Sequence, residues 1–147
     1  MFFNAWPRTT RERELAGADE ILYVSLNEAL VLYAEIRGLN REAIDSELRD
    51  IGLLDSALMR PVHAAQYADA DLAEQAATLI WGIAQNQAFI DGNKRLALVV
   101  TLTFLEVNGF HLDMTDDEKF QLMIDISSGT PAGQVAEMFR RRIRRLE

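Results

Sequence analysis

Apolar side chains recur every three or four residues along most of the chain, the spacing of helices that bury one face. A capping box, in which a hydroxyl or carboxylate side chain is followed three residues later by Glu, predicts helix starts at Ser25, Asp71 and Thr115. Strand patterns are almost absent, and only residues 110–114 are expected to form a short extended piece. The pattern predicts an all-α fold, a single compact bundle of about six to seven helices with little or no β structure.

Glycine and proline positions predict the less regular boundaries. We expect a helix over residues 40–50 that ends at Gly52, and a short one over residues 53–60 that stops at Pro61. Residues 62–70 have the least regular pattern and are expected to form a loop or flap. The other expected helices cover residues 25–38, 71–86, 93–108 and 115–127, with a last one capped by Thr130, carrying Pro131 at its first position and running through Ile143.

The first twenty residues differ from the rest of the chain. Three aromatic residues precede Pro7, and a cluster of charged residues follows it. We therefore expect an N-terminal arm over residues 1–20 and one helical domain over residues 21–147. A chain of 147 residues suits a single domain with a buried core.

Composition and charge exclude several classes of function. The chain has 23 Asp and Glu against 15 Lys and Arg, giving a net charge of −8, which argues against direct nucleic-acid binding and against docking on an anionic membrane. The absence of cysteine excludes disulfides and thiolate chemistry, and two histidines do not suggest a multi-histidine metal site. Because no apolar run could span a bilayer and residues 1–7 lack a basic segment ahead of their apolar residues, we expect a cytoplasmic protein.

Polar chemistry is concentrated in residues 87–95, Gln-Ala-Phe-Ile-Asp-Gly-Asn-Lys-Arg, between two helices with apolar faces. Gly92 permits backbone conformations closed to other residues and lets a ligand approach closely. Asn93, Lys94 and Arg95 open the next helix, whose free amides and dipole favour an anion. The two cationic side chains add donors that suit phosphate oxygens.

Asp91 stands just before this anion site. A carboxylate beside bound phosphates is the expected protein ligand of Mg²⁺, which fills the rest of its shell with phosphate and water oxygens. The local chemistry therefore predicts a cradle for the phosphates of a Mg-nucleotide. An ordinary connection between two helices, with solvated charges, is the alternative, and the local residues alone leave both interpretations open.

This segment resembles the signature of the Fic/Doc family, His-x-Phe-x-Asp/Glu-Gly/Ala-Asn-Gly/Lys-Arg. Residues 52–58 and 104–109 also resemble the Doc branch, so the resemblance covers roughly residues 22–145. Lys94 occupies the position where Fic nucleotidyltransferases carry Gly, which points to the Doc (death-on-curing) toxin subgroup. The matching signature residues are Phe89, Asp91, Gly92, Asn93, Lys94 and Arg95.

The resemblance implies a Fic/Doc-type helical bundle that binds ATP with Mg²⁺ and modifies a hydroxyl of a target protein. Doc-type toxins are understood to transfer the γ-phosphate to elongation factor Tu, which arrests translation, and to be inhibited by a Phd-like antitoxin that docks across the toxin. Carried over by position, Asp91 is expected to bind Mg²⁺, and Gly92, Asn93 and Lys94 to form the nucleotide cradle. Arg95 is expected to grip a phosphate, and Lys94 and Arg95 to act in catalysis.

Gln87 stands where the family signature has the histidine that takes the proton from the attacking hydroxyl. A glutamine amide has no usable basicity near neutral pH, although it is close to histidine in size and can keep a hydrogen bond. We therefore expect the chain as written to be severely impaired or inactive, with nucleotide binding largely intact. Two explanations for Gln87 stay open: engineered inactivation of a toxic enzyme, and a natural pseudoenzyme.

Two other functions compete with the toxin kinase. One is protein nucleotidyl transfer (AMPylation) of the Fic type, which Lys94 disfavours because its side chain crowds the space that a transferred α-phosphate needs. The other is a non-catalytic module that binds a nucleotide or a partner. Of the two histidines, His63 in the expected loop is a minor candidate for a supporting role at the target, and His111 is expected to have none.

Overall fold

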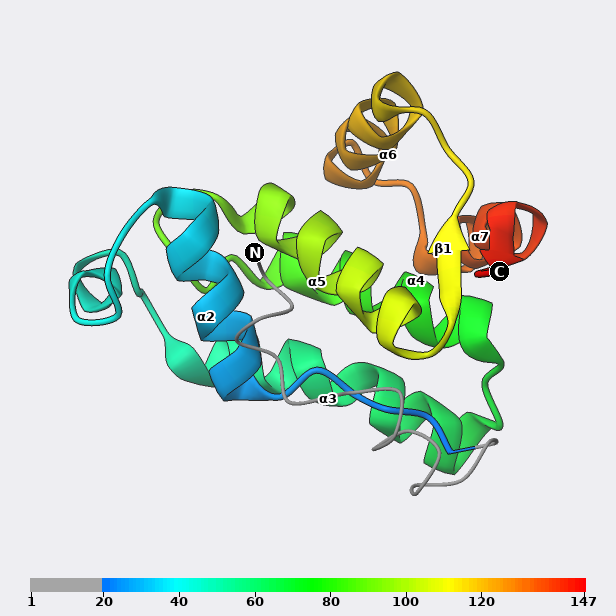
Figure 1. Ribbon diagram of the computed structural model, residues 1–147, viewed down its shortest axis with the longest axis horizontal. Helices are drawn as coiled ribbons and strands as arrows, with labels where there is room; N and C mark the ends of the chain where they lie inside the picture. Colours follow the sequence, from blue (N-terminus) through cyan, green and yellow to red (C-terminus); the bar gives the residue numbers. More distant parts are fainter. Residues whose placement is uncertain (1–19) are drawn as a thin grey trace.

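A computed structural model describes residues 20–147, which fold into six α-helices, one 3₁₀ helix and a two-stranded sheet (Figure 1). This confirms the predicted all-α class with very little β structure. The predicted arm over residues 1–20 lies outside the described part except for Glu20. The helices are α2 (Leu26–Arg37), the 3₁₀ helix η2 (Ala43–Ser46), α3 (Ile51–Ala68), α4 (Leu72–Asn86), α5 (Asn93–Val107), α6 (Asp116–Ser127) and α7 (Ala132–Arg142).

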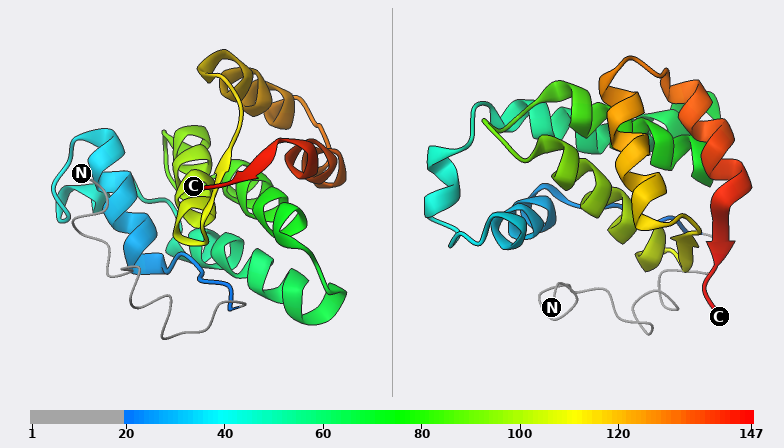
Figure 2. Two further views of the ribbon diagram at one scale, coloured as in Figure 1. Left: turned by 45° about the vertical axis from the view of Figure 1, so that its right-hand side comes forward. Right: turned by 90° about the horizontal axis from the view of Figure 1, so that it is seen from above.

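Helix α4 is the centre of the bundle. It packs against α3, α5 and α7, and α2 packs against α5 (Figures 1 and 2). In Figure 1, α2 and α3 lie on one side of the α4–α5 pair, and α6 and α7 lie toward the other. The largest fully buried side chains of the core come from most of these elements and include Tyr33, Phe89, Phe104, Phe139, Leu54, Leu79 and Leu96.

The three predicted capping boxes are present. The side chains of Ser25, Asp71 and Thr115 each accept a hydrogen bond from the backbone N–H three residues later, and the Glu at that position bonds back to the cap. Gly38 ends α2 in the left-handed conformation, with φ 67°, as its position predicts. Local hydrogen bonding decides these boundaries, which explains why the sequence shows them.

The predictions for residues 40–70 were largely wrong. Residues 40–50 contain only the 3₁₀ helix η2, because the backbone of residues 47–50 pairs with the loop before α5 instead of continuing a helix. Helix α3 then begins at Ile51 and passes through Pro61, so residues 62–68 are helical and form no flap. Pro61 is buried in the face that α3 packs on the core, and this burial outweighs the backbone hydrogen bond that proline cannot donate.

The C-terminal boundaries also shift. Pro131 is the N-cap of α7 rather than its first residue, and the helix ends at Arg142 instead of running through Ile143. Residues Ile143–Arg145 form β2, which pairs antiparallel with β1 (Phe110–Leu112). The extended piece predicted near residue 110 is therefore real. Strand β2 was mistaken for the end of a helix, because pairing between residues more than 30 positions apart leaves no local pattern.

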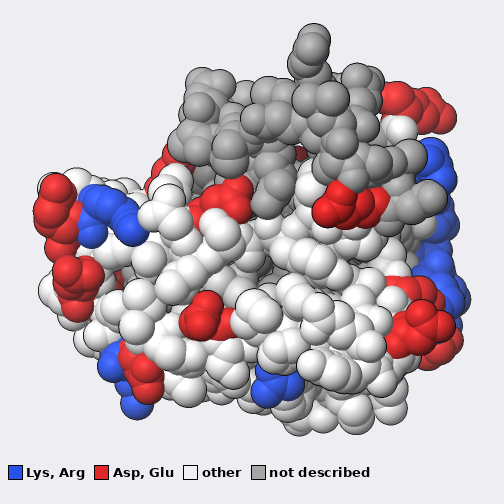
Figure 3. Space-filling view, turned by 90° about the horizontal axis from the view of Figure 1, so that it is seen from below, with Lys and Arg blue, Asp and Glu red and all other residues white. Residues whose placement is uncertain are grey.

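Charges on the surface follow no single pattern. On the face shown in Figure 3, acidic side chains are scattered among uncharged ones and basic side chains gather mainly at one edge. The described part of that face carries no broad basic surface, in keeping with the net charge of −8. None of the helices within residues 20–147 is both long enough and apolar enough to cross a bilayer.

Candidate functional site

Gln87 ends α4 and opens the loop that leads to α5. Its φ of 49° and ψ of 55° place it in the left-handed region, which residues other than Gly and Asn seldom adopt at a helix end. Its exposed side chain lines a pocket of about 430 Å³. The position at which we expect the family's histidine therefore caps the C-terminal end of α4 and lines this pocket.

The loop after Gln87 is held by backbone pairing with a distant segment. Residues 88–90 run antiparallel to residues 47–50, with an isolated bridge between Leu48 and Phe89. This pairing fixes the loop between two rigid helices, so its polar residues keep a defined direction. The bonds run from the N–H groups of Arg49 and Asp50 to the Ala88 carbonyl and from the Ile90 N–H to the Glu47 carbonyl, at 2.8, 3.2 and 2.8 Å.

The side chain of Asn93 closes the turn through hydrogen bonds to the backbone of Phe89. Its Oδ1 accepts from the Phe89 N–H at 3.0 Å, and its Nδ2 donates to the Phe89 carbonyl at 2.8 Å. The side chain is buried, and Phe89 takes both of its polar atoms, so it holds the loop. Gly92, with φ 85°, makes the sharp turn into α5. Asn93 can thus offer an anion only its backbone N–H, while its amide group shapes the turn.

The first turn of α5 has unused hydrogen-bond donors. Leu96 is the first residue whose N–H bonds back into the turn, to the Gly92 carbonyl at 2.9 Å. Within residues 20–147, the N–H groups of Asn93, Lys94 and Arg95 have no hydrogen-bond acceptor. Their alignment with the positive end of the helix dipole gives the predicted anion site its geometry.

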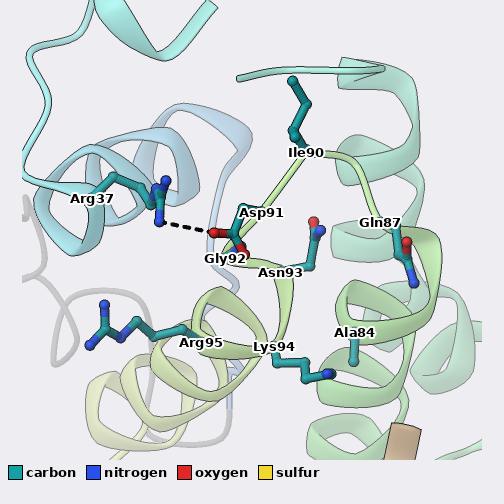
Figure 4. A pocket seen from close by; sticks show the side chains of 9 residues that line it. All are labelled: Arg37, Ala84, Gln87, Ile90, Asp91, Gly92, Asn93, Lys94 and Arg95. Atoms are coloured by element: carbon teal, nitrogen blue, oxygen red, sulfur yellow. Dashed lines mark hydrogen bonds and ion pairs between the residues drawn. The ribbon is translucent and has the colours of Figure 1, made fainter. Parts of the chain in front are cut away.

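The pocket brings the predicted residues together. Gln87, Asp91, Gly92, Asn93, Lys94 and Arg95 all line it, together with Ala84, Ile90 and Arg37 (Figure 4). Neither the Lys94 nor the Arg95 side chain has an ion-pair or hydrogen-bond partner among the described residues. His63 on α3 and His111 in β1 do not line it.

Asp91 is the acidic residue of the pocket lining. Its Oδ1 accepts from the N–H of Gly92 at 2.8 Å, and its Oδ2 lies 3.4 Å from Nη1 of Arg37. The side chain is 75% exposed, so its oxygens are accessible from the pocket. Residues 20–147 contain no group of three or more His, Cys, Asp or Glu that would hold a metal ion alone. One accessible carboxylate suits Mg²⁺ that takes its other ligands from phosphates and water.

Sequence reasoning missed the residues that support the loop from α2 and the segment after it. The Arg37 Nε lies 2.9 Å from Oε1 of Glu47, and the Tyr33 hydroxyl lies 2.7 Å from the same oxygen and 2.8 Å from the Asp91 carbonyl. The Tyr33 ring stacks on Phe89, with centroids 3.6 Å apart. More than fifty residues separate α2 from the loop, so no local spacing indicated this contact.

The pKa shifts of Tyr33, Arg37 and Glu47 favour a stable ion pair between Arg37 and Glu47. The hydrogen bond from Tyr33 and then that from Arg37 hold the pKa of Glu47 below its usual value, so the carboxylate stays ionised. Burial and then the Glu47 carboxylate raise the pKa of Tyr33, which therefore stays a hydrogen-bond donor. The hydrogen bond to Glu47 raises the pKa of Arg37 further.

Comparison with known proteins agrees with this geometry. A model of the family described as "Fic/DOC family" matches residues 23–105, more than half of the chain. The chain belongs to the Fic/DOC family. It is also similar to a protein named Toxin Doc from Mycolicibacterium smegmatis, with 40% identity over 86 residues. That match covers 56% of this chain and 66% of the relative, so the chain spans just under two thirds of that protein's length.

The part of the chain that matches the Fic/DOC family includes the polar loop. The match ends at residue 105, within α5, and includes α2, α3, α4 and the whole loop. The family segment therefore contains both the pocket and the support that Tyr33, Arg37 and Glu47 give to it. The roles of individual pocket residues in binding and catalysis stay predictions.

Proposed function

We propose that this chain is a Doc-type toxin of a toxin–antitoxin module whose pocket binds ATP with Mg²⁺ for phosphoryl transfer to a protein hydroxyl. The observation that carries the proposal is the pocket at the start of α5. There, three N–H groups and the side chains of Lys94 and Arg95 have no partner among residues 20–147. The similarity to a protein named Toxin Doc supports the same function.

The pocket residues fit a Mg-nucleotide in four ways. The N–H groups of Asn93, Lys94 and Arg95 would bind phosphate oxygens, and the guanidinium of Arg95 would pair with one phosphate. Asp91 would hold Mg²⁺, which would supply positive charge that offsets the negative charge of the phosphates. Gly92 leaves room for the phosphates close to the backbone.

The reaction requires a base, and the amide of Gln87 cannot act as one. The oxygen of the target hydroxyl forms a bond to the γ-phosphorus, the bond from that phosphorus to the ADP oxygen breaks, and the hydroxyl proton must go to a base. Gln87, at the C-terminal end of α4, can orient the hydroxyl through its amide but cannot accept the proton. Because loss of a general base typically costs ~10²–10⁴ in rate, we propose that the chain is catalytically impaired with Gln87 in place.

The target and partner follow from the same proposal. The target would be elongation factor Tu, so that phosphorylation arrests translation in the cytoplasm, and a Phd-like antitoxin would keep the toxin inactive. Fic-type nucleotidyl transfer is the competing reaction. Lys94 argues against it because its side chain occupies the α4 side of the pocket, beside Ala84 in the view of Figure 4.

The test is to restore the base and follow the label. Gln87→His suits the backbone, because histidine accepts the left-handed conformation more readily than most residues. We expect purified Gln87→His protein to transfer label from γ-labelled ATP, but not from α-labelled ATP, to elongation factor Tu. Its expression is expected to arrest growth unless a Phd-like antitoxin is co-expressed. The protein with Gln87 is expected to be slower by about 10²–10⁴-fold.

A matched control is Gln66→His, which adds a histidine on α3 outside the pocket and is expected to leave activity unchanged. Transfer of the α-label by Gln87→His would identify a nucleotidyltransferase instead. Stabilisation by Mg-ATP without transfer of either label would identify a binding module, since ligand binding raises the melting temperature by mass action. Absence of both stabilisation and transfer would contradict the proposed nucleotide site itself.

A further inference from the structure

We propose that Arg37, reaching the pocket from α2, is a third phosphate-binding cation of this site, held in place by Glu47. The inference rests on the proposed function, because it assigns a residue to the same nucleotide pocket. Arg37 lies 54 positions before Asp91, outside the signature segment at residues 87–95. It lines the pocket on the side opposite Lys94 (Figure 4).

One edge of the Arg37 guanidinium is anchored. Its Nε donates to Oε1 of Glu47 at 2.9 Å, and Glu47 is itself fixed, because its side chain lies 2.7 Å from the Tyr33 hydroxyl and its carbonyl accepts from the Ile90 N–H at 2.8 Å. The arginine is therefore tied to the same backbone pairing that holds the loop. A long side chain fixed in this way loses little further conformational freedom when it binds a ligand.

The other edge of the guanidinium faces the pocket. Arginine has five N–H donors, and within residues 20–147 Arg37 donates only from Nε to Glu47 and from Nη1 to Asp91. The second contact is long, at 3.4 Å, and Asp91 is 75% exposed, so solvent weakens the pair. The remaining donors beside Asp91 are available for the phosphate oxygens that a metal on Asp91 would bring close to them.

Local charge makes the pocket strongly anion-attracting. Its lining contains three cations, Arg37, Lys94 and Arg95, against the single carboxylate of Asp91, in a chain whose net charge is −8. Glu47 faces Arg37 from outside the lining and offsets part of that excess. Without Arg37, the cations of the lining would be Lys94 and Arg95, which both lie in the first turn of α5. The side of the pocket formed by α2 would then have no cation.

Gly92 is shaped for this approach. A Cβ atom built on Gly92 would lie 3.3 Å from Cδ of Arg37 and 3.3 Å from Cε1 of Tyr33. A side chain at this position would therefore crowd Arg37 and Tyr33, and both would have to shift by a few tenths of an ångström. The glycine thus permits a sharp turn and also lets α2 lie close enough for its arginine to reach the pocket.

Direct binding measurements test the inference. Calorimetry with Mg-ATP, and separately with inorganic tripolyphosphate, would compare the parent protein with Arg37→Gln, Arg37→Lys and the control Arg41→Gln. Arg41 is an exposed arginine that bonds to Asn27 and does not line the pocket. Loss of charge-assisted hydrogen bonds predicts a dissociation constant about tenfold or more higher for Arg37→Gln with both ligands. Arg37→Lys keeps the positive charge but loses the paired N–H donors of the guanidinium. Its dissociation constant is expected to lie between those of the parent protein and Arg37→Gln.

Each outcome has a definite meaning. Equal affinity of the parent protein and Arg37→Gln would overturn the role of Arg37 and leave the proposed function standing. If the parent protein bound neither ligand, the result would contradict both the proposed nucleotide pocket and the proposed role of Arg37. Suppose that Arg37→Lys bound the ligands as weakly as Arg37→Gln, and that both variants without ligand unfolded at a lower temperature than the parent protein. Arg37 would then be a structural support of the loop and not a phosphate ligand.

Discussion

Asn93 pairs with both main-chain polar groups of Phe89, accepting from its N–H at 3.0 Å and donating to its carbonyl at 2.8 Å. The side chain of one residue thereby acts as a strand partner for another residue four positions earlier. The turn is closed without help from a ligand, so the N–H groups at the start of α5 are already directed at the pocket before anything binds. An anion site arranged in advance loses less binding energy to ordering than a flexible loop would.

Asn93→Ala should destabilise the protein by about 2–3 kcal/mol, because it leaves the buried N–H and carbonyl of Phe89 without partners. Urea unfolding monitored by circular dichroism would measure the change. The control is Asn27→Ala, which removes an exposed hydrogen bond to Arg41 and is expected to change stability by less than about 0.5 kcal/mol. Equal effects of the two substitutions would mean that the Asn93 bridge contributes little.

Gln87→Gly should stabilise the protein by about 0.5–1 kcal/mol. At φ 49° a side chain is strained, and relief of that strain outweighs the larger entropy of glycine in the unfolded chain. The same change at Gln66, inside α3, should destabilise by about 0.5 kcal/mol because the backbone there is helical. Thermal unfolding of both variants measures the difference. A loss of stability in both would show that the Gln87 side chain makes contacts worth more than its strain.

Tyr33→Phe should cost about 1 kcal/mol, because it keeps the ring stacked on Phe89 but removes the hydroxyl beside Glu47 and the Asp91 carbonyl. Chemical denaturation is the measurement, and Tyr67→Phe is the control because Tyr67 is 83% exposed. Hydrogen exchange of the Ile90 amide, which bonds to the Glu47 carbonyl, should also become faster in Tyr33→Phe. Unchanged exchange would argue against the coupling between α2 and the loop.

Stability should fall in acid through Glu118. The hydrogen bond from Arg142, followed by that from the Thr115 backbone, lowers the pKa of Glu118 to about 2. Because the pKa in the folded protein lies below the ordinary value of 4.5, this contribution is fully present above about pH 4.5 and is lost as the pH falls toward 2. Denaturation series at several pH values for the parent protein and Glu118→Gln would show it.

Glu118→Gln should flatten this acid dependence and lower stability near neutral pH. Asp117→Asn, which removes a neighbouring charge from the first turn of α6, is the matched control and should leave most of the slope in place. The ion pair joins α6 to the end of α7, with 2.8 Å between Glu118 Oε1 and Arg142 Nη2. If Glu118→Gln kept the full slope, other carboxylates would be responsible for the acid sensitivity.

Features that depend on a few consecutive residues were predictable. The three capping boxes, the glycine that ends α2 and the helices on both sides of the loop lie where the sequence places them. Residues 87–95 could be singled out for the same reason, because a turn and the first turn of a helix are local structures. All six pocket residues chosen from that segment line one cavity.

Features that depend on distant partners were not predictable in this way. A helix over residues 40–50 was expected from its possible cap at Asn40 and its stop at Gly52, but residues 47–50 pair with the backbone of the loop instead. Pro61 was expected to stop a helix, and burial against the core overrides it. Strand β2 exists because β1 lies beside it, and its own residues continue the helical spacing of α7.

The amino-acid sequence by itself determined the all-helical class, most helix ends and the chemical character of the loop, because these follow from hydrogen bonds and side-chain spacing within one or two turns. Only the tertiary structure decided that Arg37 and Tyr33 of α2, and Glu47 after it, complete and support the pocket. Contacts across fifty residues arise from the packing of whole helices, and that packing is set by the shape of the core, which no local pattern records.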